Sequence, residues 1–183
     1  MTETAHRRAT MPEAASIILE TRSLESAHRR LAELLRPGMS VLDVGCGTGA
    51  ITHGIAEVVR VNGGLTVGID VNPNLIAAAV ENHKSDSRLW YVTGDAYRLP
   101  LRRTFDIVTA ARVLQWLAEP MRALREMLSV AKDTATLIVL DYNHRKISWM
   151  PEPPRSMWTF YESFLSWRQE AGMDNEIADH LEA

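Results

Sequence analysis

The sequence predicts an α/β fold with a doubly wound, mostly parallel sheet. Short apolar runs alternate with segments of helical periodicity along the middle of the chain. These runs are apolar throughout, as in strands that helices cover on both faces. In addition, a glycine-rich turn, Asp-Val-Gly-Cys-Gly-Thr-Gly at residues 43–49, leads from the first run into a helix. Together these observations predict parallel strands joined by crossover helices.

Each expected element follows from its own local pattern. Helices are expected over 50–61, over 72–83, where Asn72 and Pro73 suit a helix start, and from 120 to about 131. Because crossovers between parallel strands are right-handed, the order is that of a Rossmann-like fold. The strands are expected at 40–44, 65–69, 89–92, 105–110 and 136–140.

The segments on either side differ from this alternation. Leucines and isoleucines at helical spacing predict a helix from Pro12 to Leu35, which Pro37 and Gly38 end. After the last strand, three prolines mark a linker at 151–154, and an aromatic-rich helix and a further helical segment are expected beyond it. We therefore expect three parts: an N-terminal helical segment 1–36, a Rossmann-like domain 37–145 that binds a cofactor, and a helical tail 146–183 that serves as an incomplete cap or substrate region.

Composition excludes several classes of function. The chain has 183 residues and a net charge of -3, so nucleic acid is not an expected partner. Cys46 is the only cysteine, which argues against disulfides and a cysteine metal site and fits a reducing cytoplasm. No apolar run is long enough to span a bilayer. We expect a cytoplasmic protein without a bound metal.

The glycine-rich turn has a definite chemical use. Gly45, Gly47 and Gly49 let the backbone approach a ligand closely and adopt conformations closed to other residues. The helix that follows offers free N–H groups at its start. With Ala50 in the third small position, the turn also satisfies the looser dinucleotide fingerprint. The turn alone therefore fits a nicotinamide or another adenosine cofactor.

Three acidic residues near the strand ends narrow the choice of cofactor. Asp43 would repel a pyrophosphate but help to hold an ammonium group. Asp70 ends the second strand, where a carboxylate accepts both ribose hydroxyls, and Asp95 is placed to meet an adenine amino group. The alternative for Asp70 and Asp95 is a helix cap. Cys46 suggests a nucleophile, but with no base nearby in sequence we favour a packing role.

The chain resembles class I S-adenosylmethionine-dependent methyltransferases, in the branch that includes the ubiquinone/menaquinone biosynthesis and trans-aconitate methyltransferases. The matching motifs extend over residues 35–141 in family order and spacing. They are Val-Leu-Asp-Val-Gly-Cys-Gly-Thr-Gly at 41–49, Val-Gly-Ile-Asp-Val-Asn-Pro at 67–73, Gly-Asp-Ala at 94–96, Phe-Asp-Ile-Val at 105–108 and Val-Leu-Gln-Trp-Leu-Ala-Glu-Pro at 113–120.

The resemblance implies a role for each matched position. The loop would cradle the methionine portion of S-adenosylmethionine, Asp70 would bind the ribose, and Asp95 with the Ala96 N–H would bind adenine. Arg112 would lie near the sulfonium through its backbone. The complete expected cofactor-binding set is Asp43, Gly45, Cys46, Gly47, Gly49, Asp70, Val71, Asp95, Ala96 and Arg112.

The expected reaction is in-line methyl transfer to a small-molecule acceptor. The enzyme has to align donor and acceptor and exclude water, and it needs a base only if the nucleophile carries a proton. Tyr142 and His144, just past the fifth strand at the ligand-binding edge, are the candidate catalytic residues. A surface or capping role for His144 is the alternative. Trp116 and the tail aromatics suit either a pocket wall or plain core.

The chain departs from this family at its end. Family members finish with an antiparallel hairpin beyond the fifth strand, and no segment here shows a pattern for it, so the chain resembles a shortened member. Strand 136–140 then becomes an apolar edge. Three arrangements at this edge stay open: a homodimer through the edge, exchange of the tail between two chains, and a tail folded back over the edge. Two other functions also stay open: a non-catalytic S-adenosylmethionine-binding relic, and an NAD-dependent oxidoreductase, which Asp43 argues against.

Overall fold

The computed structural model describes residues 20–83 and 87–181, and these form two compact units. The first unit contains the described residues of 11–111 together with 121–139. The second contains 112–120 and the described residues from 140 onward.

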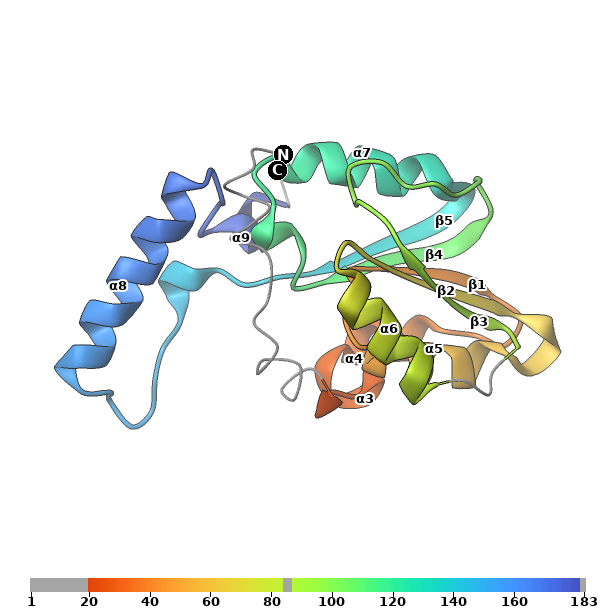
Figure 1. The fold of residues 1–183 in the computed structure, drawn as a ribbon, viewed down its shortest axis with the longest axis horizontal. Coiled ribbons are helices and arrows are strands. Elements are labelled where there is room, and N and C mark those ends of the chain that lie inside the picture. Colours follow the sequence, from red (N-terminus) through yellow and green to blue (C-terminus); the bar gives the residue numbers. More distant parts are fainter. Residues whose placement is uncertain (1–19, 84–86, 182–183) are drawn as a thin grey trace. The chain divides into compact units, whose positions relative to one another are not determined.

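A five-stranded sheet is the framework of the first unit (Figure 1). Its strand order is β3-β2-β1-β4-β5. The central strand β1 pairs in parallel with both β2 and β4, so that Val41 lies beside Thr66 on one side and Ile107 on the other. This confirms the predicted Rossmann-like class. The strands are β1 (Ser40–Val44), β2 (Leu65–Asp70), β3 (Leu89–Thr93), β4 (Phe105–Ala111) and β5 (Ala131–Leu140).

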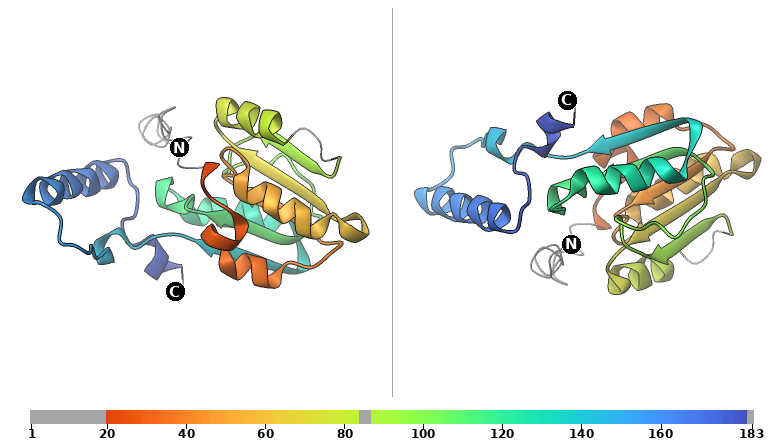
Figure 2. Two further views of the ribbon diagram at one scale, coloured as in Figure 1. Left: turned by 90° about the horizontal axis from the view of Figure 1, so that it is seen from below. Right: turned by 90° about the horizontal axis from the view of Figure 1, so that it is seen from above.

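Helices cover both faces of this sheet (Figures 1 and 2). On one face lies α7 (Pro120–Val130), and on the other lie α5 (Ala50–Val59) and α6 (Pro73–Asn82). Asn72 caps α6 through a hydrogen bond from the Asn74 N–H, as its sequence predicts. A short turn, η2 (Val61–Gly63), follows α5. The core beneath α5 consists of Leu24, Leu31, Leu35, Val41, Ile55, Val59, Ile107 and Ile138.

Within the described residues, the predicted N-terminal helix is broken rather than continuous. Of the expected helix over residues 12–35, positions 12–19 lie outside the described residues. The rest forms α3 (Leu24–Ala27) and α4 (Arg29–Leu34), separated at His28. Ser23 starts α3 with a capping box. At the break, His28 is buried and its ring lies 2.9 Å from the Thr109 hydroxyl.

Strand β5 begins five residues earlier than predicted. It follows α7 directly, and its first half is mostly polar and exposed. The apolar run in the sequence therefore indicates only the second half of the strand. In the part of the chain that the structure describes, no strand follows β5, which stands at the edge of the sheet. The predicted lack of a hairpin is therefore confirmed for these residues.

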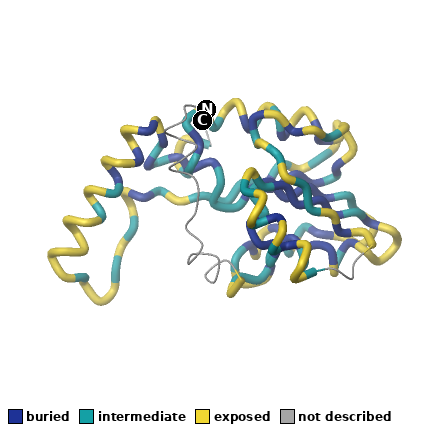
Figure 3. The backbone as a smooth tube through the Cα atoms, viewed as in Figure 1, coloured by how far each residue is buried: buried dark blue, intermediate teal, exposed yellow. Residues whose placement is uncertain are grey.

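The second unit is helical. It contains η3 (Leu114–Trp116), η4 (His144–Lys146), α8 (Arg155–Glu170) and α9 (Ile177–His180). Most residues of α8 are exposed, in contrast to the buried central strands of the sheet (Figure 3). Among the described residues, no helix is both long and apolar enough to cross a membrane.

Candidate cofactor-binding site

The glycine-rich loop connects the end of β1 to the start of α5. Gly45, Gly47 and Gly49 all have positive φ angles, of 73°, 57° and 81°. Side chains with a Cβ rarely adopt this conformation, so the loop needs glycine at each position. Gly49 is also the N-cap of α5, and a Cβ there would collide with the Tyr91 hydroxyl. The loop is thus held in one shape by backbone geometry and by its neighbours.

Asp70 joins this loop to the end of β2. Its Oδ2 accepts a hydrogen bond from the Gly47 N–H at 3.0 Å, and its Oδ1 accepts one from the Asn72 N–H at 2.9 Å. Burial raises the pKa of the Asp70 carboxyl, while these backbone hydrogen bonds lower it. The carboxylate lies at the carboxyl edge of the parallel sheet, where ligands bind in such folds.

Asp43 lies beneath the loop and is almost fully buried. Its Oδ2 accepts a hydrogen bond of 2.7 Å from the hydroxyl of Thr52 on α5. Burial raises the pKa of Asp43 to about 7, and the nearby charge of Asp70 adds to the rise. A buried carboxylate in this position favours a cation over a phosphate in the loop.

Asp95 follows β3 and is exposed. Its Oδ1 accepts a hydrogen bond from the Tyr97 N–H at 2.9 Å, which forms a turn within its own loop. Ala96 is half-buried in that turn, and Val71, beside Asp70, is exposed. The first unit therefore brings together Asp43, the glycine loop and Asp70, while the adenine role of Asp95 stays a prediction.

Arg112 and Tyr142 contact each other in the second unit. The Nε–H of Arg112 donates to the Tyr142 hydroxyl at 2.6 Å, and its guanidinium lies 5.6 Å from the ring centroid. Arg112 has a φ of +63°, and its backbone N–H donates to the Leu140 carbonyl at 2.6 Å. A non-glycine residue with this φ is strained, and such strain is frequent at functional sites.

His144 is buried in a hydrogen-bond network rather than exposed as a cap. Its Nε2 lies 2.7 Å from Oε1 of Gln115, and its Nδ1 lies 3.0 Å from the Tyr161 hydroxyl. Because Nε2 of Gln115 donates to the Arg112 carbonyl, Oε1 faces the ring, and His144 donates to it through Nε2–H. Burial, with the charge of Arg168, lowers the pKa of His144 to about 4. The ring is therefore neutral at pH 7.

Arg168 is the residue that the sequence did not single out. It is fully buried on α8, and its guanidinium lies 4.9 Å from the Trp116 ring centroid and 5.5 Å from that of Phe164. Its Nε–H donates to Asn175 Oδ1 at 2.8 Å, and Nη2 donates to the Gln115 carbonyl at 2.7 Å. The sequence does contain one signal for this contact, because Arg168 follows the aromatic Phe164 by four residues on the expected helix.

The family model described as a methyltransferase domain matches residues 35–177, which is most of the chain. The chain belongs to this methyltransferase family. The match includes the loop, all three strand-end acids and most of the helical unit.

Similar curated proteins include enzymes named as methyltransferases. A demethylmenaquinone methyltransferase from Staphylococcus aureus is 35% identical over 58% of the chain and 44% of its own length. A malonyl-[acyl-carrier protein] O-methyltransferase from Marinomonas is 34% identical over 50% of the chain and 34% of its own length. The chain thus spans less than half the length of these curated relatives.

A solved structure supports the same assignment over the whole fold. The crystal structure of a SAM-dependent methyltransferase from Aquifex aeolicus is 25% identical, with a TM-score of 0.68. The match covers 89% of each chain. The methyltransferase family and this fold confirm S-adenosylmethionine as the cofactor.

The residues of the methyltransferase loop fit this cofactor chemically. The loop glycines allow close backbone approach, and Asp70 offers acceptors for hydroxyl groups. Among the described residues, no basic side chain acts on the pKa of either Asp43 or Asp70, so these two carboxylates complement a cationic ligand. S-adenosylmethionine carries an ammonium and a sulfonium, whereas NAD would bring a diphosphate against Asp43.

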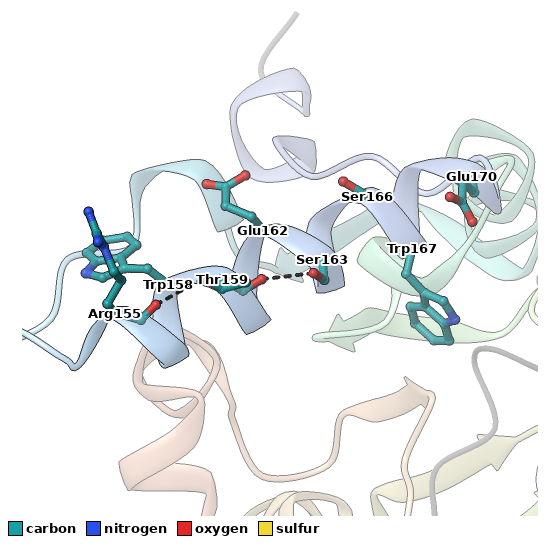
Figure 4. A pocket seen from close by; sticks show the side chains of 8 residues that line it. All are labelled: Arg155, Trp158, Thr159, Glu162, Ser163, Ser166, Trp167 and Glu170. Atoms are coloured by element: carbon teal, nitrogen blue, oxygen red, sulfur yellow. Dashed lines mark hydrogen bonds between the residues drawn. The ribbon is translucent and has the colours of Figure 1, made fainter.

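A groove elsewhere on the methyltransferase chain has a different character (Figure 4). Every residue that lines it belongs to α8, including Trp158 and Trp167. Two hydroxyl groups in this groove donate to backbone carbonyls of α8. The Thr159 hydroxyl donates to the Arg155 carbonyl, and the Ser163 hydroxyl donates to the Thr159 carbonyl. No loop glycine or strand-end acid contributes to this surface, so it is not the cofactor site.

Proposed function

We propose that the chain transfers the methyl group of S-adenosylmethionine to a small-molecule acceptor by in-line displacement. The observation that supports this most strongly is the hydrogen bond between the Gly47 N–H and Asp70, which joins the loop and the ribose-binding carboxylate. When bound, the cofactor supplies an already electrophilic methyl group. What the chain has to provide is alignment of donor and acceptor, and exclusion of water.

The roles of the cofactor-binding residues follow from their geometry. The backbone of Gly45 and Gly47 would hold the methionine portion, with Asp43 complementing its ammonium group. Asp70 has both oxygens on backbone N–H groups, which fixes its carboxylate for the ribose hydroxyls. Asp95 and the Ala96 N–H would meet adenine. Arg112 would act through its backbone.

The relatives do not indicate which methyl acceptor this chain uses. Their names specify different acceptors, a demethylmenaquinone and a malonyl-[acyl-carrier protein], and the shared residues cover less than half of each protein. We propose that Tyr142 and His144 meet the acceptor. Because Nε2 already carries a proton, the neutral His144 would take a proton at Nδ1, which lies 3.0 Å from the Tyr161 hydroxyl; that hydroxyl also donates to the His144 carbonyl. An acceptor without a proton on its nucleophile needs no base.

One specific observation favours a second candidate, a non-catalytic protein that binds S-adenosylmethionine. No strand follows β5 within the described residues, so the family's usual sheet edge is incomplete there. This candidate shares the entire cofactor site with the enzyme. The two differ only in turnover.

Turnover with labelled donor therefore tests the proposal. The full chain is incubated with S-adenosylmethionine labelled in its methyl group and with pools of small molecules, and S-adenosylhomocysteine formation is followed. We expect turnover that His144→Gln reduces without weakening S-adenosylhomocysteine binding. His180→Gln, an exposed histidine in the same unit, is the matched control. Cofactor binding without methyl transfer to any pool would favour the non-catalytic candidate.

A further inference from the structure

We propose that the helical unit contains a carboxylate-binding site formed by Arg168 and Asp141, which takes the acid group of a small organic acid. This inference rests on the proposed function only in identifying that acid as the methyl acceptor. The binding site itself is argued from the buried groups of the unit and can be tested by binding alone.

Arg168 brings an unused donor to this site. The side chain is fully buried, and two of its nitrogens, Nε and Nη2, donate to Asn175 and to the Gln115 carbonyl. Nη1 is also buried and has no hydrogen-bond partner among the described residues. A buried guanidinium N–H without an acceptor is costly, so an acceptor that reaches it gains the full value of a charged hydrogen bond.

Asp141 brings an unused oxygen. Its Oδ2 accepts the Leu114 N–H at 3.1 Å, while Oδ1 is buried with no partner in the described part of the chain. Leu114 precedes Gln115, the residue whose carbonyl accepts from Arg168. Asp141 and Arg168 therefore bond to neighbouring residues of the one-turn helix η3, Leu114 and Gln115, and each leaves one polar atom without a partner among the described residues.

The charge around these atoms favours an anion. Arg168 and Arg112 both act electrostatically on Asp141, Asp174 acts on Arg168, and His144 is neutral, so protonation of Asp141 leaves two positive groups against one carboxylate. Burial raises the pKa of Asp141 to about 7, with the backbone hydrogen bonds and both arginines lowering it. A ligand carboxylate can accept from Nη1–H and from a protonated Asp141 at Oδ1. Binding then draws one proton from solution onto Asp141.

Benzoate and benzamide are suitable probes, because they have the same shape and differ in charge. Each is titrated into the full chain saturated with S-adenosylhomocysteine, at pH 8, in two buffers with different heats of ionisation. We expect benzoate to bind roughly tenfold or more tightly than benzamide, with uptake of about one proton per benzoate. Arg168→Gln should weaken benzoate binding roughly tenfold or more, whereas Arg155→Gln, an exposed arginine on the same helix, should not.

Asp141→Asn keeps the proposal falsifiable if Arg168→Gln fails to fold. The asparagine can still accept the Leu114 N–H and donate to benzoate, so binding should persist without proton uptake. Equal affinity for benzamide, unchanged proton uptake in Asp141→Asn, or no benzoate binding to a chain that binds S-adenosylhomocysteine would overturn the inference. Loss of S-adenosylhomocysteine binding itself would instead contradict the proposed function.

Discussion

The Gly47 N–H donates to Oδ2 of Asp70 across 3.0 Å, and this contact connects the loop after β1 to the carboxyl end of β2. The other oxygen of Asp70 accepts the Asn72 N–H at the start of α6. One carboxylate therefore sets the position of two chain segments at the edge of the sheet. Because it also faces the expected ribose, cofactor binding and loop geometry should depend on the same residue.

The first prediction concerns the replacement Asp70→Ala. It removes the acceptors for the ribose and for two backbone N–H groups, so S-adenosylhomocysteine binding should weaken by about 1–3 kcal/mol, roughly 5- to 150-fold. Isothermal titration measures the change. Asp133→Ala, an exposed acid on β5, should leave the affinity unaltered. A folded Asp70→Ala chain with wild-type affinity would remove Asp70 from the site.

The second prediction separates backbone strain from loss of the cofactor contact. Gly47 and Gly63 both have positive φ angles, of 57° and 79°, so valine strains the backbone at either position. Only Gly47 lies in the cofactor loop. Gly47→Val should abolish S-adenosylhomocysteine binding, while Gly63→Val should bind normally with a similar loss of thermal stability. Equal binding by the two variants would show that the loop does not approach the cofactor.

The third prediction follows from the raised pKa of Asp43. In the folded chain this pKa is about 7, against 3.8 for an ordinary aspartate, so the native state holds more protons than the unfolded state between these values. Stability from this group is therefore greatest below pH 4, falls as the pH rises towards 7, and stays level above that. Asp43→Asn keeps an acceptor for Thr52 and removes the cost of burying a charge.

Thermal unfolding checks this sign directly. Relative to wild type, Asp43→Asn should gain stability as the pH rises from 4 to 7, and it should bind S-adenosylhomocysteine more weakly at pH 8. The difference between the two proteins isolates Asp43, because Asp141 contributes a similar raised pKa to both. A relative loss of stability over the same window would mean that Asp43 is held as a carboxylate in the free chain.

The fourth prediction concerns the edge strand β5. Its second half carries partly buried apolar side chains, Leu137, Val139 and Leu140, and in the described residues no further strand pairs with it. Such an edge is a template for association, so we propose a homodimer through it. Sedimentation velocity should show a concentration-dependent dimer that Val139→Lys disrupts. A monomer at all concentrations, with β5 amides still protected from exchange, would point to cover by the tail.

Much of the fold was predictable because local patterns and global topology agree. The glycine loop, the Asn72 cap and four of the five strands have strong local signals. Two features have no such local signal, the polar first half of β5 and the break at His28. An exposed edge strand and a buried histidine both depend on tertiary neighbours.

In the candidate site, too, some residues were predictable from local sequence and others were not. Asp43 and Asp70 were predictable from their places near strand ends, and their partners Thr52 and Gly47 lie in the same local motif. Arg168 was not, because its burial depends on Gln115, which is far away in sequence. His144 was predicted to be a base or a surface cap, and only the folded chain shows its bonds to Gln115 and Tyr161.

Isothermal titration of the full chain with S-adenosylhomocysteine and, separately, with NAD⁺ tests the central claim most directly. The loop is compatible with both cofactors in sequence, and the buried Asp43 distinguishes them by charge. We expect one-to-one binding of S-adenosylhomocysteine and no measurable heat with NAD⁺. Saturable NAD⁺ binding without S-adenosylhomocysteine binding would contradict it.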